Sequence, residues 1–162
     1  MQTEPAIFVD GARSLETVFH ELIPISKQMG ICVVSYDGQS LELAAPLAAN
    51  INHQQSAFGG SLYSIAALAG WGMIQLKLNE MHLDCNTVIG KGEVTYKRPV
   101  FDDFRCRCCL PESYPAFASA LKESGKASIN LEAVVSVDGK PAMTLTGQYV
   151  VTKRPETNRD TR

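Results

Sequence analysis

A polar stretch placed directly before an uncharged one is the part of this sequence best suited to chemistry. Residues 50–61 read NINHQQSAFGGS and combine amide, imidazole and hydroxyl side chains with a pair of glycines. Residues 62–76, LYSIAALAGWGMIQL, carry no charge and have the composition of a helix that is buried on all sides. The first amides of a helix have no partner within it, and the helix dipole makes that end partly positive. The junction therefore suits a reaction in which negative charge develops on a bound carbonyl oxygen.

The two glycines at this junction, Gly59 and Gly60, let the backbone approach a ligand closely because they have no Cβ atoms. Their N–H groups, together with that of Ser61, can form an oxyanion hole. The alternative is that the pair only allows tight packing where the loop enters the helix.

The side chains of the loop offer a base and several hydrogen-bonding groups. His53 is the only one that titrates near neutral pH, so it suits a general base, although a lone loop histidine is often just exposed to solvent. Asn50 and Asn52 can hold water or a carbonyl through their amides, and for Asn50 we favour the alternative of capping local backbone. Ser56 and Ser64 are further candidate donors, but a serine within a helix more often bonds back to its own backbone.

Composition predicts a single soluble domain, residues 13–152, between flexible termini at 1–12 and 153–162. A length of 162 residues favours one domain, and 45% hydrophobic and 20% charged residues are ordinary for a globular protein. A net charge of -2 gives no support to nucleic-acid binding. The five cysteines have no zinc-site spacing, so we expect free thiols, small and buried in the CRCC segment, and no metal. The N-terminus lacks the order of a signal peptide, which predicts a cytoplasmic protein.

The elements that must position the junction begin with a helix. Apolar spacing predicts that it starts at Ser14, is interrupted at Pro24 and ends at Gly30. A hairpin centred on the Asp37-Gly38 pair follows. The uncharged helix then runs from about Ser61 to Asn79, and its Gly, Ser and Gln residues make it too weakly hydrophobic for a membrane span.

Strand-forming segments make up the rest of the chain. A second hairpin signal, DGKP at residues 138–141, joins the last two of them. Strands on both sides of one apolar helix suggest an antiparallel sheet curled about that helix. The edges of such a sheet are commonly covered by a second subunit, so we expect a homodimer. The segments are 87–100, 104–110, 127–137 and 142–152, with a loop and a short helix in 111–125.

The segment APLAANINHQQSAFGGSLYSIAALAGWG, residues 45–72, resembles the thioesterase domain of the hot-dog superfamily that lies at the C-terminal end of YiiD-type acetyltransferase proteins. The likeness runs from about Ser14 to Thr152. The Asn-rich loop, AFGGSL and LAGWG are together specific to that domain. Only a dozen or so residues precede the first predicted helix, so we expect no acetyltransferase domain in this chain.

The resemblance implies a hot-dog fold, in which an antiparallel curved sheet wraps around a long central helix, here with an extra N-terminal helix. Hot-dog proteins of this type act on acyl thioesters of coenzyme A (acyl-CoA) or of acyl carrier protein (acyl-ACP). Their active site lies at a dimer interface and needs no metal or other cofactor. The expected function is therefore an acyl thioesterase that works as a homodimer or a dimer of two dimers.

The resemblance also indicates how the site residues work. The N-terminus of the central helix points at the thioester carbonyl, and Asn52 matches by position an asparagine that orients water or substrate. Lys97 and Arg98 would meet the phosphates of coenzyme A or of the carrier's pantetheine, with solvated strand-end charges as the alternative. The expected catalytic residues are Asn52, His53, Gly60 and Ser61, and the expected substrate-binding residues are Ser56, Phe58, Gly59, Ser64, Lys97 and Arg98.

One departure from the family pattern concerns the base. Many hot-dog thioesterases carry Asp or Glu about two turns into the central helix, where this chain has the apolar residues Ala66 to Leu68. Either His53 with Asn52 replaces that acid, or Asp102 or Asp103 arrives across the dimer, or catalysis is weak.

Three other functions therefore stay open. The missing acid favours a non-catalytic module that binds acyl-CoA or acyl-ACP in fatty-acid metabolism. A dehydratase acting on 3-hydroxyacyl thioesters would need a helix acid paired with the histidine, and only the histidine is available. A purely structural dimer would have no affinity for thioesters.

Overall fold

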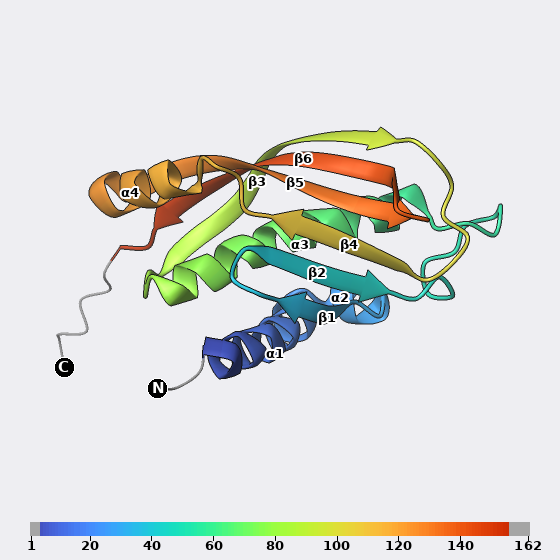
Figure 1. Ribbon diagram of the computed structural model, residues 1–162, viewed down its shortest axis with the longest axis horizontal. Coiled ribbons are helices and arrows are strands. Elements are labelled where there is room, and N and C mark those ends of the chain that lie inside the picture. The colour runs from blue at the N-terminus through green and yellow to red at the C-terminus, as the bar shows by residue number, and fades with distance from the viewer. Residues whose placement is uncertain (1–3, 156–162) are drawn as a thin grey trace.

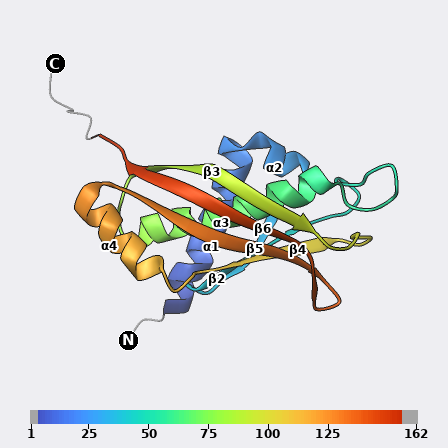
Figure 2. The ribbon, with the colours of Figure 1, turned by 90° about the horizontal axis from the view of Figure 1, so that it is seen from above.

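The structure, a computed structural model, describes residues 4–155, with side chains described from residue 11 onward. Six strands form one antiparallel sheet in the order β1-β2-β4-β5-β6-β3. The sheet curls around the long helix α3 (Gly59–Glu80), as Figures 1 and 2 show. This confirms the predicted antiparallel sheet wrapped about an apolar helix. The strands are β1 (Cys32–Tyr36), β2 (Ser40–Ala45), β3 (Cys85–Tyr96), β4 (Phe104–Cys109), β5 (Lys126–Val137) and β6 (Lys140–Lys153).

Most of helix α3 is buried, because its apolar residues occur on nearly every face. The prediction that it is buried on all sides is wrong for one stripe, since Ser64, Ala67, Trp71 and Gln75 recur at helical spacing and are only partly buried. Small residues let the sheet come close: a Cβ atom on Gly70 would lie 2.2 Å from the Tyr149 hydroxyl oxygen. That hydroxyl donates a hydrogen bond to the Ala67 carbonyl at 2.8 Å, which ties the middle of α3 to β6. Within residues 4–155, no helix is both long and apolar enough to span a membrane.

Both predicted hairpins are confirmed, and their turns have the expected local chemistry. Asp37 Oδ1 accepts hydrogen bonds from the amides of Gln39 at 2.9 Å and Ser40 at 2.7 Å, while Gly38 has a φ of 89°. In the second turn Asp138 and Gly139 have φ values of 50° and 73°. Asp and Gly tolerate this left-handed region better than other residues, so each pair fixes the register of its two strands.

The predicted start of the first helix at Ser14 is wrong. Helix α1 spans Glu4–Leu22, so residues 4–12, expected to be flexible, are helical. The sequence signal was present, since proline is favoured in the first turn of a helix and Pro5 lies there. The interruption at Pro24 is confirmed, because that residue begins a separate short helix, α2 (Pro24–Gln28). At the other end, Lys153 was expected to be flexible but is the last residue of β6, and the Arg154 amide donates to the Asp84 carbonyl at 3.0 Å. The rest of the expected flexible termini, 1–3 and 156–162, lies outside the described residues.

The two edges of the sheet differ. Helix α1 lies beside the edge strand β1 (Figure 1), where Glu16 Oε2 accepts a hydrogen bond from the Val33 amide at 2.8 Å. His20 Nε2 donates to the Ile31 carbonyl at 2.7 Å, so α1 side chains occupy the hydrogen-bonding groups of that edge. The opposite edge strand, β3, has exposed apolar side chains, with Val88 59% exposed. No other described element pairs with its outer edge.

The cysteines are free thiols, as predicted, and only some of them are buried. Cys85, Cys106 and Cys108 are buried in the core. Cys32 and Cys109 are exposed. The expectation of buried thiols throughout the CRCC segment is therefore wrong for Cys109, because alternate residues of a strand face opposite sides of the sheet.

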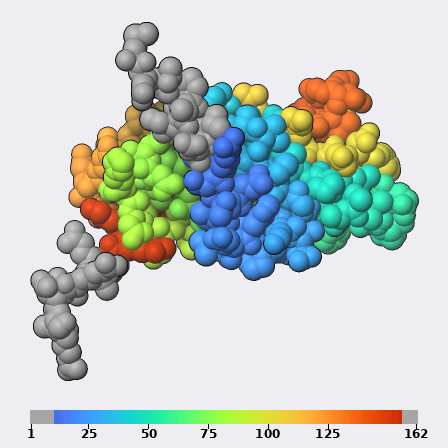
Figure 3. All heavy atoms as spheres, turned by 90° about the horizontal axis from the view of Figure 1, so that it is seen from below, coloured from blue at the N-terminus to red at the C-terminus, as the bar shows by residue number. Residues whose placement is uncertain are grey.

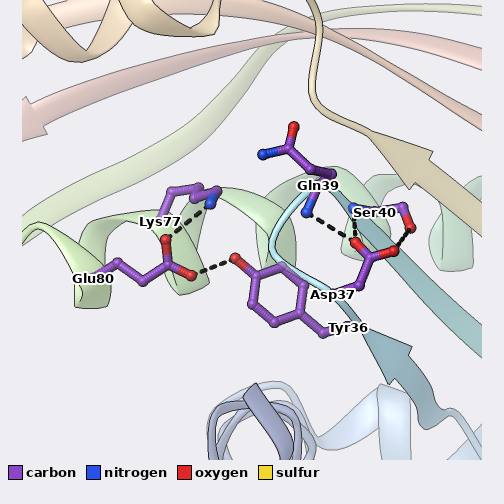
Figure 4. A network of polar contacts seen from close by, with 6 residues as sticks. All are labelled: Tyr36, Asp37, Gln39, Ser40, Lys77 and Glu80. Carbon is purple, nitrogen blue, oxygen red and sulfur yellow. Dashed lines mark hydrogen bonds and ion pairs between the residues drawn. The ribbon is translucent and has the colours of Figure 1, made fainter. Parts of the chain in front are cut away.

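A charged cluster closes the C-terminal end of α3, next to α4 (Tyr114–Ser124), the short helix predicted in 111–125. Lys77 is only 7% exposed, and its Nζ lies 2.8 Å from Glu80 Oε2. The Tyr36 hydroxyl donates to Glu80 Oε1 at 2.5 Å (Figure 4). The ammonium also lies 5.9 Å from the Tyr36 ring centroid and 5.6 Å from that of Tyr114, within the range of cation–π attraction. The buried charge is thus compensated by one carboxylate and two rings.

We predict that Glu80→Gln destabilises the protein more than Lys77→Met. The first variant leaves a nearly buried ammonium without its anion, at a cost of about 2–3 kcal/mol, whereas the second replaces it with an apolar side chain of similar length. In the second variant Glu80, whose side chain is 36% exposed, keeps contact with water. Urea unfolding of the wild type and of each variant measures the two losses in the free energy of unfolding. A larger loss for Lys77→Met would show that cation–π packing outweighs the ion pair.

Candidate active site

The junction singled out by the sequence lies where α3 begins, at the end of a loop that projects from one end of the molecule (teal in Figures 1 and 3). The last loop residue, Phe58, has extended backbone with φ -63° and ψ 131°, and no side chain caps the helix. Two backbone hydrogen bonds hold this point in place. The Phe58 amide donates to the Asn50 carbonyl, and the Ala57 amide donates to the Val100 carbonyl, each at 2.7 Å.

Two amides at the start of α3 have no acceptor among the described residues. The amides of Ser61 and Leu62 donate to the Phe58 carbonyl at 2.9 and 3.1 Å, but those of Gly59 and Gly60 make no hydrogen bond within residues 4–155. The predicted set of three oxyanion donors is therefore reduced to two, because the Ser61 amide is already engaged. No acidic side chain occupies the first turn, so the positive end of the helix dipole is not neutralised there.

Of the two glycines, only Gly60 lies too close to a neighbour to accept a Cβ atom without a shift of that neighbour. A Cβ atom on Gly60 would lie 2.4 Å from the Phe58 ring, and one on Gly59 would lie 3.5 Å from the Tyr96 ring. The Tyr96 hydroxyl donates a hydrogen bond to the Gly59 carbonyl at 2.8 Å. Partial burial and the neighbouring Tyr63 raise the pKa of Tyr96, so its hydroxyl remains protonated and able to donate.

A cavity of about 320 Å³ lies beside this helix end. It brings together three residues that the sequence analysis named for substrate binding: Gly59, Lys97 and Arg98. The two cations follow directly after β3, at the point where its last residue, Tyr96, contacts the start of α3. The described lining of the cavity contains no acidic side chain. It consists of Ala57, Gly59, Leu62, Tyr96, Lys97, Arg98, Pro99 and Val100.

Two loop side chains, those of Asn52 and Ser56, shape the loop by hydrogen-bonding to each other and to its backbone. Asn52 Oδ1 accepts from the amides of Gln54 at 2.8 Å and Ser56 at 3.2 Å, and its Nδ2 donates to Ser56 Oγ at 3.1 Å. Asn50 is buried and its side chain donates to the Pro46 carbonyl at 2.8 Å, which confirms the expectation that it caps local backbone. It also donates to the Met29 carbonyl at 2.8 Å, a contact between segments distant in the sequence. The side-chain amide of Asn52 is thus held by hydrogen bonds to residues 54 and 56 of the same loop.

The remaining residues of the predicted site differ in exposure. His53 lies exposed in the loop and makes no hydrogen bond or ion pair with another described residue. Phe58 is 57% exposed. Ser64 Oγ donates back to the Gly60 carbonyl at 2.8 Å, the alternative expected for a helical serine. The catalytic and binding roles assigned to these residues stay predictions.

The position of the missing helix acid is apolar in the structure. Ala66 is fully buried and Leu68 is 8% exposed, so no carboxylate of α3 approaches the site from there. Of the two aspartates considered as replacements, Asp103 accepts a hydrogen bond from the Leu47 amide at 2.8 Å, and Asp102 is exposed. Tyr96 was not predicted to belong to the site. Its strand alternation shows which face it occupies, but nothing local predicts a contact with a residue 37 positions earlier.

The comparisons with known proteins agree with this geometry. A family model described as "Putative thioesterase (yiiD_Cterm)" matches residues 12–153. A solved structure from Chlorobaculum tepidum, of unknown function, is 39% identical, with a TM-score of 0.83 over 88% of this chain and 94% of that one. A "putative thioesterase" from Shewanella oneidensis is 32% identical, with a TM-score of 0.82 over 90% of this chain and 99% of that one.

A more distant structure shares the fold. It is a "Probable Thioesterase" from Pseudomonas aeruginosa, 20% identical, with a TM-score of 0.76 over 88% of this chain and 95% of that one. The family match covers nearly the whole described chain, and the sheet curled about α3 is the architecture of these neighbours. The chain therefore has the hot-dog fold and belongs to the "putative thioesterase (yiiD_Cterm)" family.

Proposed function

We propose that this protein is an acyl thioesterase that hydrolyses acyl-CoA or acyl-ACP thioesters at the start of α3. The observation that carries the proposal is the pair of unengaged amides, Gly59 and Gly60, of which Gly59 lines a cavity together with Lys97 and Arg98. Membership of the thioesterase family supports the same reaction. The thioester carbonyl oxygen would accept hydrogen bonds from the two amides, which stabilise it most when it becomes negative in the transition state.

In this reaction the oxygen of water bonds to the acyl carbon, the carbon–sulfur bond breaks, and the thiol leaves with a proton. A base must accept one proton from the attacking water. We assign that role to His53 of the loop, with Asp102 from a second copy of the chain as the alternative. Asn52 would orient water or substrate only after giving up part of its hydrogen bonding to Ser56.

The site is proposed to be completed by a homodimer, alone or as a dimer of dimers. Strand β3 supports this, because it is a long edge strand with no described partner on its outer side and with Val88, Ile89 and Tyr96 all exposed. Pairing of β3 with its copy would cover these side chains and bring a second chain close to Tyr96 and the cavity. Sedimentation analysis of the mass in solution checks this part of the proposal.

A non-catalytic acyl-thioester binding module is the second candidate. The specific observation in its favour is the apolar segment at Ala66 and Leu68, where a carboxylate base would otherwise lie. The two candidates differ in one readout, since a binding module would retain an acyl thioester without releasing thiol from it.

We predict that Gly60→Pro lowers kcat for thioester hydrolysis about 10²–10³-fold relative to Gly60→Ala. Both variants add a Cβ atom against the exposed Phe58 ring, but only proline removes the N–H group. Proline is tolerated in the first turn of a helix, because its missing N–H would have no helical partner there. Thiol release from a panel of acyl-CoA and acyl-ACP substrates gives the rates. Equal kcat values in the two variants would contradict the role of the Gly60 amide.

Neutralising Lys97 and Arg98 should weaken substrate binding and leave chemistry intact. For Lys97→Gln/Arg98→Gln we expect KM for an acyl-CoA to rise at least tenfold, with kcat within about twofold, because the cations contact phosphates remote from the reacting carbonyl. The matched control is Lys126→Gln/Lys153→Gln, which removes the same charge at the opposite end of the sheet, where β5 begins and β6 ends. A similar rise in KM in the control would contradict specific binding by Lys97 and Arg98, because it would show non-specific attraction between the protein and the substrate phosphates.

A further inference from the structure

We propose that Tyr96 is a positioning residue, which aims the Gly60 amide at the thioester carbonyl by holding the peptide group that joins Gly59 to Gly60. This inference rests on the proposed function and deepens it. The functional group involved is the Tyr96 hydroxyl, which donates to the Gly59 carbonyl at 2.8 Å.

The geometry follows from the planarity of the peptide group. The Gly59 carbonyl and the Gly60 N–H belong to one planar unit and point in opposite directions when the bond is trans. The described chain contains no cis peptide bond. A hydrogen bond that fixes the direction of the carbonyl therefore also fixes the direction of the N–H group.

This peptide needs an external restraint. It lies between two glycines, which have the widest conformational freedom of all residues, and no side chain caps the helix at Phe58. Helix ends fray more readily than helix interiors, and the two backbone bonds at this junction hold Ala57 and Phe58 rather than the peptide between the glycines. The Tyr96 ring, 3.5 Å from the position that a Cβ atom would take on Gly59, adds a packing contact to the hydrogen bond.

The same bond also affects the strength of the donor. A hydrogen bond accepted by a peptide carbonyl polarises the peptide group and makes its N–H a better donor. Tyr96 remains protonated, since burial and Tyr63 raise its pKa. It thus links the end of β3, the strand proposed to bind a second copy, to the proposed oxyanion donor.

The test is Tyr96→Phe, which keeps the ring over Gly59 and removes only the hydroxyl. We expect kcat to fall about tenfold with KM unchanged, because the amide is less well aimed in the transition state. The control Tyr63→Phe removes a hydroxyl that makes no hydrogen bond with a described residue, and its kcat should stay within twofold. An unchanged kcat in Tyr96→Phe would overturn the inference.

A double-variant cycle separates positioning from mere stabilisation of the fold. Without the Gly60 N–H there is nothing to aim, so Tyr96→Phe should not lower kcat further in the Gly60→Pro background. An additional tenfold loss there would show that Tyr96 acts by another route. If Gly60→Pro and Gly60→Ala have equal kcat values, the proposed oxyanion site itself is wrong.

If the wild type releases no thiol, the proposed hydrolysis fails and Tyr96 is judged from a structural readout. The ¹⁵N and ¹H resonances of the Gly60 amide should then shift in Tyr96→Phe more than in Tyr63→Phe. Equal shifts in the two variants would overturn the positioning role.

Discussion

The enclosure of α3 by the curled sheet is the constraint on which the other features of the molecule depend. A helix buried along its length satisfies its own backbone polar groups except at its ends, and α3 has no charged side chain between Gly59 and Gln75. The charged side chains of α3 therefore lie at its C-terminal end, and its amides without a helical partner lie at its start. At the C-terminal end Lys77 and Glu80 neutralise each other beside two tyrosine rings. At the N-terminal end no acidic side chain of the first turn neutralises the amides of Gly59 and Gly60. Among the described residues that line the cavity there, only Lys97 and Arg98 are cations.

The start of α3 is held by segments that are far apart in the sequence. The Asn50 carbonyl accepts from the Phe58 amide, the Val100 carbonyl accepts from the Ala57 amide, and the Tyr96 hydroxyl donates to the Gly59 carbonyl. The loop before the helix and the segment after β3 therefore form one assembly around the first turn. The Asn52 side chain bonds to Ser56 within the loop, and the Asn50 side chain ties the loop to the Met29 carbonyl. The unengaged amides of Gly59 and Gly60 are hydrogen-bond donors fixed in the backbone rather than carried on a side chain.

How much of this could be predicted from the sequence depends on whether the signal is local. The Asp-Gly pairs at both hairpins predict their turns, and the uncharged run predicts a buried helix, because each property belongs to a few neighbouring residues. The order of strand segments on both sides of that helix predicts a sheet curled about it, and the resemblance to the family implies the same fold. The pairing of Asn52 with Ser56 and the contact of Tyr96 with Gly59 were not predicted. Alternation shows which face of a strand a side chain occupies, but its partner is decided by tertiary packing. The early start of α1 at Glu4 was missed because Ser14 offered a plausible cap within a longer helix.

The central claim is that the free amides of α3 bind the carbonyl oxygen of an acyl thioester. The most direct measurement is a titration of ¹⁵N-labelled protein with a transition-state mimic of coenzyme A that carries an oxyanion at the acyl carbon, followed through the amide resonances of Gly59 and Gly60. The account predicts that both amide protons move downfield, in the direction of a stronger hydrogen bond, and more than those of Ser61 and Leu62, which already donate to Phe58. Saturable binding that leaves the Gly59 and Gly60 resonances in place would contradict it, because the ligand would then occupy another part of the molecule.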